Sequence, residues 1–234
     1  MIIVQQKPLN QIHEMTKNHK QILILGCDGC AAIIQAGGEK QAQILKQLLE
    51  MKRKLTKSPN LNAKAISTLR QCDRQITANA LNPIINKYDA VLSLACGVGV
   101  QTLAEIYPNK DIIPANDTKF IGTHETPPGT FLEYCRACGD CILNETAGIC
   151  PITRCAKSLL NGPCGGQSKG KCEVGGGKND CAWVLIYNRL KDKDQLHLFT
   201  KFHPPKDYRI SEHPREISPE TTQQAEKAQE AKTQ

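Results

Sequence analysis

Twelve cysteines spread over 234 residues are the side chains whose type and spacing could do chemistry. In a reducing compartment such as the cytosol, so many thiols argue against a disulfide framework. Metal ligation is the interpretation that remains, because thiolates are ligands for soft metals. We therefore take all twelve as candidate metal-binding and cofactor-binding residues: Cys27, Cys30, Cys72, Cys96, Cys135, Cys138, Cys141, Cys150, Cys155, Cys164, Cys172 and Cys181.

Short apolar runs alternate with helical stretches in the first half of the chain. This alternation predicts an α/β fold with an open parallel sheet of the Rossmann-like or flavodoxin-like type. In chain order we expect strand 21–25, helix 39–54, strand 63–69, helix 77–86, strand 89–95, helix 98–106 and strand 111–114.

The first four cysteines all lie where an expected strand ends. Cys27 and Cys30 follow the first strand, Cys72 follows the second, and Cys96 follows the third. The carboxyl ends of parallel strands meet at one edge of the sheet, and open α/β sheets bind ligands there. Four thiolates at that edge suit a 4Fe-4S cluster or zinc. In the alternative interpretation, Cys72 and Cys96 are ordinary buried cysteines, and only the Cys27-x-x-Cys30 pair is special, as a redox dithiol.

The other eight cysteines begin with the spacing Cys135-x-x-Cys138-x-x-Cys141 and continue with Cys150-Pro151. Bacterial ferredoxins wrap a cubane cluster with such a triplet, and a later Cys-Pro ligates their other cluster. Here eight residues separate Cys141 from Cys150 and no second triplet follows, so a plain two-cluster ferredoxin fold is not expected. Eight ligands make two four-ligand sites, but the spacing leaves their partition open. Zinc stays an alternative to iron at one site, and a wholly structural multi-zinc module is an alternative for both.

A change of composition predicts two domains and a tail. Seven of the sixteen residues from Gly162 to Gly177 are glycine, and large apolar residues are sparse there. Such a segment cannot offset its ordering entropy by apolar burial, so bound metal would have to stabilise it. The expected parts are a cysteine-containing α/β domain at 1–121, a linker at 122–129, an irregular cysteine-rich iron-sulfur domain at 130–205, and a mobile tail at 206–234.

Composition also argues against several classes of function. The net charge of +7 is mild, so nucleic-acid binding is not expected. No stretch approaches the roughly 20 apolar residues of a membrane helix, and the polar start does not suit a signal peptide, so we expect a soluble cytoplasmic protein that binds no membrane. The histidines are scattered and none stands beside a cysteine pair or a paired carboxylate. We therefore assign no catalytic residue.

Four runs of sequence carry a resemblance to a known family. They are CRACGDC at 135–141, GICPITRCAK at 148–157, LLNGPCGG at 159–166 and GKCEV at 170–174. With them the chain resembles the small iron-sulfur subunit, of the MetV type, of two-subunit methylenetetrahydrofolate reductases, which is the methylenetetrahydrofolate reductase C-terminal domain family. The similarity is dense from 135 to about 190, and looser but consistent at 26–30 and 95–99.

The resemblance implies a division of labour between two chains. In that family the folate and the flavin belong to a separate catalytic barrel subunit, and the small subunit carries iron-sulfur clusters. It thus implies an electron-transfer subunit with two or three 4Fe-4S clusters and no flavin of its own. Such a subunit would pass electrons to the flavin of its partner for reduction of methylenetetrahydrofolate to methyltetrahydrofolate, in the reductive acetyl-CoA pathway or related one-carbon metabolism. A ferredoxin or another donor subunit would supply the electrons.

Two other functions compete with this one. The chain could be a zinc-stabilised scaffold that holds the catalytic subunit without a redox role. Alternatively, the α/β domain could be an enzyme with a substrate at its cluster. The enzyme ranks last because four cysteines would fill the iron sites of a cubane and leave none open for substrate. The sequence thus favours a non-catalytic subunit of an oxidoreductase.

Overall fold

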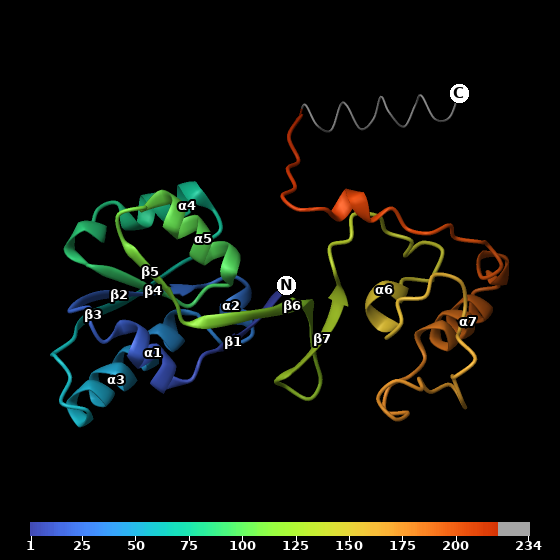
Figure 1. Ribbon diagram of the computed structural model, residues 1–234, viewed down its shortest axis with the longest axis horizontal. Helices are drawn as coiled ribbons and strands as arrows, with labels where there is room; N and C mark the ends of the chain where they lie inside the picture. Colours follow the sequence, from blue (N-terminus) through green and yellow to red (C-terminus); the bar gives the residue numbers. More distant parts are fainter. Residues whose placement is uncertain (220–234) are drawn as a thin grey trace. The chain divides into compact units, whose positions relative to one another are not determined.

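The structure is a computed structural model that describes residues 1–219 (Figure 1). It divides into two compact units, of which the first is Met1–Tyr134 and the second begins at Cys135. The part of the expected tail from 220 to 234 lies outside the described residues. None of the helices within residues 1–219 is long and apolar enough to cross a membrane.

The first unit contains the predicted open parallel sheet. Its strands lie in the order β3-β2-β4-β5, and all three neighbouring pairs are parallel. Ile22 lies opposite Ala63 on one side and Ala90 on the other, so β2 is a central strand. The α/β class and the parallel sheet predicted from the sequence are confirmed. The bounds of the strands are β2 Gln21–Cys27, β3 Asn62–Thr68, β4 Ala90–Ser93 and β5 Asp111–Pro114.

Helices cover both faces of this sheet (Figure 1). Successive side chains of a strand point to opposite faces, and β2 shows the consequence. Ile22 and Ile24 pack in the core on the side of α1 and α3, whereas Leu23 and Leu25 pack in the core that includes residues of α4 and α5. The two-layer covering explains why β2 is apolar at nearly every position. The helices of this unit are α1 Leu9–Thr16, α2 Cys30–Ile33, α3 Glu39–Leu55, α4 Arg74–Leu81 and α5 Gly97–Ile106.

The helix expected at 77–86 differs from the observed one at both ends. Asp73 accepts a hydrogen bond from the backbone N–H of Ile76 at 2.9 Å, so this N-cap starts α4 at Arg74. At the other end Asn82 keeps helical backbone, but Pro83 has no N–H to continue the helical hydrogen bonds, and α4 ends at Leu81. A separate 3-10 turn, η1 (Ile85–Lys87), follows.

A second, three-stranded sheet was missed by the sequence reasoning. Its order is β1-β6-β7, with bounds β1 Ile2–Gln6, β6 Asn116–Glu125 and β7 Thr130–Cys135. β1 pairs with β6 in the antiparallel sense. The segment expected to be a linker, 122–129, thus holds the end of β6 and the turn into β7. Ile3 and Val4 of β1 are buried in a small core that also contains Cys27.

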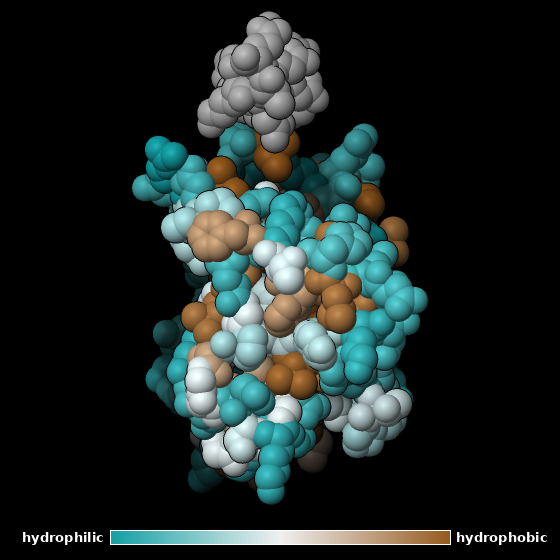
Figure 2. Space-filling model, turned by 90° about the vertical axis from the view of Figure 1, so that its right-hand side faces the viewer, coloured by the Kyte–Doolittle hydropathy of each residue, from teal (hydrophilic) through white to brown (hydrophobic). Residues whose placement is uncertain are grey.

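The second unit is largely irregular and has a small apolar core around one helix. This helix, α7 (Ala182–Asp192), buries Trp183, Ile186 and Leu190. The indole N–H of Trp183 donates to the backbone carbonyl of Leu159 at 2.9 Å. Figure 2 shows hydrophobic residues scattered among hydrophilic ones over a face of this unit. Its other helical elements are α6 Pro151–Arg154, η2 Leu196–Leu198 and η3 Tyr208–Ser211.

Two adjacent leucines of α3 test the placement of this helix. Leu49 is 0% exposed in the core between α3 and the sheet, whereas Leu48 is 41% exposed. We expect Leu49→Ala to lower the free energy of unfolding by about 3 kcal/mol, because it removes apolar burial and leaves a cavity. Leu48→Ala, the matched control, should lower it by less than about 1 kcal/mol. Urea denaturation measures both values, and equal effects would contradict the placement.

Candidate metal centre

The first four cysteines lie at the carboxyl edge of the parallel sheet. Cys27 ends β2, Cys30 begins α2, Cys72 stands between β3 and α4, and Cys96 immediately precedes α5. Cys27 is buried, Cys30 and Cys96 are half-buried, and Cys72 is exposed. The exposure of Cys72 speaks against the alternative in which it is an ordinary core cysteine.

Three of these thiols lie near one another. Cys27 and Cys96 pack in the same apolar cluster, together with Ala31 and Ala95. Partial burial of the sulfur raises the pKa of Cys72, although the residue as a whole is exposed, and the charges of Cys96 and Cys27 raise this pKa further. Charges act on each other in this way only at short range. The topology therefore brings Cys27, Cys72 and Cys96 together at one edge, as the strand positions predicted.

A buried glutamine ties the loop that carries Cys72 to the ends of the neighbouring strands. The side-chain amide of Gln71 donates to the backbone carbonyls of Leu25 and Gly26, both at 2.9 Å. Its Oε1 accepts from the hydroxyl of Ser93 at 2.6 Å. Gln71 and Ser93 are both 0% exposed. One amide thus fixes the ends of β2 and β4 to the residue directly before Cys72.

Close packing behind Cys96 requires a glycine. A Cβ atom at Gly99 would lie 2.7 Å from the Cβ of Ala95 and 2.9 Å from that of Gln71. Without that atom, the first turn of α5 can approach the Gln71 loop closely. Cys96 is the residue directly before this ten-residue helix.

The cysteine triplet begins at the end of β7 and continues in a loop. The backbone N–H of Ala137 donates to the sulfur of Cys135 at 3.3 Å. Ala137 and Gly139 have positive φ angles, 50° and 88°. Such backbone turns its N–H groups toward one side, and N–H donors of this kind stabilise anionic sulfur. The thiol of Cys138 donates to the backbone carbonyl of Asp140 at 3.7 Å.

The remaining five cysteines are divided between the core of the second unit and its surface loops. Cys181 is buried, directly before α7, and Cys155 packs against the same apolar cluster. Cys164 donates to Oε1 of Glu173 at 3.6 Å. The others are half-buried: Cys150 directly before α6, and Cys172 in a loop, with its N–H on the carbonyl of Asn179 at 2.9 Å.

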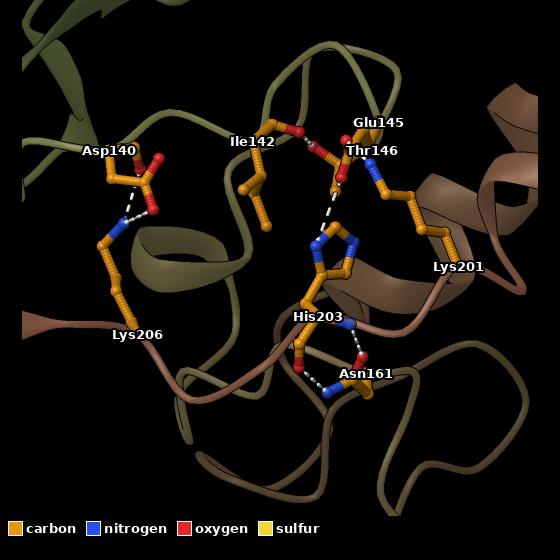
Figure 3. Close-up of polar contacts among 8 residues, drawn as sticks. All are labelled: Asp140, Ile142, Glu145, Thr146, Asn161, Lys201, His203 and Lys206. Atoms are coloured by element: carbon orange, nitrogen blue, oxygen red, sulfur yellow. Dashed lines mark hydrogen bonds and ion pairs between the residues drawn. The ribbon is translucent and has the colours of Figure 1, made fainter. Parts of the chain in front are cut away.

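A segment near the end of the described chain, residues 201–207, runs beside the triplet loop (Figure 3). His203 is buried, and its Nδ1 lies 3.2 Å from Oε2 of Glu145, which also pairs with Lys201. The side-chain amide of Asn161 donates to the carbonyl of His203 at 2.8 Å, and the N–H of His203 donates to Oδ1 of Asn161 at 2.7 Å. We call residues 201–207 the strap.

The strap ends in a nearly buried lysine. The side chain of Lys206 is 4% exposed, and its Nζ lies 2.5 Å from the backbone carbonyl oxygen of Asp140 and 3.1 Å from Oδ2 of the same residue. Burial alone would lower the pKa of Lys206. The hydrogen bond to Asp140 and the charge of Cys138 outweigh burial and raise this pKa above its usual value. Lys206 therefore stays protonated beside the triplet.

Sequence reasoning missed the strap residues. It assigned Lys206 to the tail and regarded His203 as scattered. The pairs that hold the strap join positions 42 to 66 residues apart in the chain, and no local spacing indicates them. The only signal in the sequence was the pair of prolines, Pro204 and Pro205, at the end of the segment assigned to the cysteine-rich domain.

The fit of a metal to these residues rests on donor chemistry. All twelve cysteines are free thiols. Within residues 1–219, no three His, Cys, Asp or Glu side chains gather in a group that could hold a metal ion. Soft thiol donors, an N–H on the sulfur of Cys135 and a lysine beside Cys138 are surroundings that stabilise thiolate ligands of iron or zinc. The donor set therefore fits such a group.

The role of Gln71 in the cysteine edge can be tested with a substitution of similar size. Gln71→Met should leave the carbonyls of Leu25 and Gly26 and the hydroxyl of Ser93 without their partner. We expect a loss of about 3 kcal/mol in the free energy of unfolding, and faster labelling of Cys27 by a thiol reagent.

Gln101→Met is the matched control for this substitution. Gln101 is exposed, and its amide donates only to Gly97 one turn earlier in the same helix, at 3.0 Å. Its replacement should change neither stability nor labelling by a measurable amount. Unchanged Cys27 labelling in Gln71→Met would contradict the role assigned to the glutamine.

Comparison with known proteins gives one match. Residues 113–209 match the family model described as "Methylene-tetrahydrofolate reductase C terminal". No curated protein and no solved structure matches the chain. The matched residues include all eight cysteines of the second unit and the whole strap. The resemblance predicted from the sequence is confirmed over this region, where the chain is similar to the methylenetetrahydrofolate reductase C-terminal family.

Proposed function

We propose that this chain is the iron-sulfur electron-transfer subunit of a methylenetetrahydrofolate reductase complex. The observation that carries the proposal is the family match over 113–209, which contains the triplet and five further cysteines. The function would be delivery of electrons to the flavin of a separate catalytic subunit, for reduction of methylenetetrahydrofolate to methyltetrahydrofolate. A ferredoxin or another donor subunit would reduce this chain.

The residues of the chain would hold two or three 4Fe-4S clusters through cysteine thiolates. Such clusters, when bound, accept and release single electrons. Cys135, Cys138 and Cys141 would provide ligands at the spacing that wraps a cubane, and the backbone N–H of Ala137 already donates to the sulfur of Cys135. Cys27, Cys72 and Cys96, together with Cys30, provide a second set at the edge of the parallel sheet.

The proposed division between two subunits agrees with the fold of the first unit. A catalytic barrel closes eight parallel strands, whereas the parallel sheet here has four strands and is open. Its ligand-binding edge carries cysteines where an enzyme of this fold class would carry catalytic side chains. The flavin and the folate are accordingly assigned to the partner.

A zinc-stabilised scaffold is the second candidate. The second unit favours it to some extent, since the apolar core around α7 is small and the segment 162–177 is rich in glycine. Four thiolates bind zinc with a geometry similar to that of a cubane. Such a subunit would hold the catalytic chain in place and would be colourless.

Metal analysis of anaerobically purified protein distinguishes the two candidates. We expect about eight to twelve irons and as many sulfides per chain, with a broad visible absorbance that dithionite bleaches. Iron, sulfide and zinc are measured on the same sample as the spectrum. Mainly zinc without colour would reject electron transfer in favour of the scaffold.

Two cysteine variants assign clusters to the two units. Cys138→Ala should lose about four irons and lower the stability of the second unit, because part of its folding free energy is metal-binding energy. Cys96→Ala, its matched counterpart in the first unit, should lose a similar amount and leave the triplet cluster intact. Iron content and thermal denaturation measure both effects. Full iron content in either variant would remove that cysteine from the ligand set.

A further inference from the structure

We propose that Lys206 is a positioning residue that raises the reduction potential of the cluster bound by the Cys135–Cys141 triplet. The inference rests on the proposed function and identifies a residue that tunes the reduction potential of one of its clusters. Among the charged groups on the strap, Lys206 is the one whose side chain is almost fully buried, at 4% exposed, and it lies against the triplet loop.

Lys206 and the middle cysteine of the triplet meet at one oxygen atom. The backbone carbonyl of Asp140 accepts a hydrogen bond from Nζ of Lys206 at 2.5 Å and one from the thiol of Cys138 at 3.7 Å. When Cys138 ligates iron its sulfur is a thiolate and donates no proton. The ammonium of Lys206 then faces an anionic sulfur across the shared carbonyl. Asp140 is a residue of the triplet loop itself, so the contact belongs to the ligand loop.

The strap holds Lys206 in this place. Three residues earlier, the backbone of His203 makes two hydrogen bonds with the side-chain amide of Asn161, and the His203 ring contacts Glu145. Pro204 and Pro205 connect this anchor to Lys206, and proline restricts φ to a narrow range. The backbone that leads to Lys206 is therefore stiff, and its ammonium stays at the carbonyl of Asp140 instead of extending into water (Figure 3).

A fixed positive charge beside a cluster changes the energy of the added electron. Reduction makes the cluster more negative by one charge, and no bond forms or breaks. An ammonium whose side chain is 4% exposed attracts this charge more strongly than one that extends into water, because fewer water molecules screen it. Removal of the charge should therefore make the cluster harder to reduce. The carboxylate of Asp140, 3.1 Å from Nζ, offsets part of the effect and is exposed to solvent.

Two substitutions separate charge from packing. Lys206→Gln removes the charge and keeps an N–H donor for the carbonyl of Asp140, whereas Lys206→Arg keeps the charge. Lys201→Gln is the matched control, because Lys201 is also on the strap but pairs with Glu145 and has a side chain that is 56% exposed. All are made in the full chain, purified anaerobically and titrated with dithionite while the reduced clusters are followed by electron paramagnetic resonance.

In Lys206→Gln we expect one cluster to lose at least tenfold in its equilibrium constant for reduction, which corresponds to a fall of about 59 mV in midpoint potential for a one-electron couple. The other clusters should keep their potentials, and the iron content should not change. Lys206→Arg and Lys201→Gln should titrate like the unmodified protein.

The outcomes that would overturn the inference are distinct from those that would overturn the proposed function. Reducible clusters with an unchanged potential in Lys206→Gln would reject the role of Lys206 and leave electron transfer standing. Equal shifts in Lys206→Gln and Lys206→Arg would also reject it, since packing and not charge would be the cause. If the unmodified protein holds no reducible iron, the proposed function fails and the inference fails with it.

Discussion

Parallel pairing of β2 with both β3 and β4 is the constraint on which the cysteine edge depends. Each strand can reach its parallel neighbour only through a crossover, so the loops that leave these three strands emerge at one edge. Cys27 is the last residue of β2, and the loops after β3 and β4 carry Cys72 and Cys96. The pairing therefore brings together thiols from distant parts of the chain, since 69 positions separate Cys27 from Cys96. The buried amide of Gln71 holds the ends of β2 and β4 together, because it makes hydrogen bonds to the backbone of β2 and to the hydroxyl of Ser93 in β4.

The second unit meets a different physical problem. Its apolar core is formed mainly by α7 and a few residues before it, and much of the chain from 135 to 181 has no regular structure. Separate polar contacts order this segment. They are the backbone hydrogen bond to the sulfur of Cys135, the hydrogen bond between Trp183 and Leu159, and the contacts of the strap. Each such contact contributes little, about 1 kcal/mol. Bonds between cysteine thiolates and a metal would supply the missing folding free energy, and the high density of cysteines in this segment favours that explanation.

The sequence predicted the parts of the molecule in which local pattern and tertiary role agree. The apolar run of β2 and the helical spacing in α3 gave the parallel sheet, and with it the edge where the first cysteines lie. The small sheet escaped prediction because β1 pairs with β6 more than a hundred residues later, and polar residues interrupt β6. The strap escaped for a related reason. His203 and Lys206 are held by contacts with distant residues, and their own neighbourhood resembles a polar tail.

The burial of Lys206 in the strap needs a physical explanation, because its neighbourhood in the sequence is polar. A lysine in a polar segment is normally solvated, because burial of an ammonium without a partner costs several kcal/mol. Lys206 avoids this cost through the carbonyl and carboxylate of Asp140, a residue that lies between the second and third cysteines of the triplet. A thiolate at Cys138 would strengthen the same arrangement, since it adds a second anion near the ammonium. The burial of Lys206 is thus easier to explain if the triplet carries negative charge than if its thiols stay neutral, and this links the strap to the ligand role proposed for the cysteines.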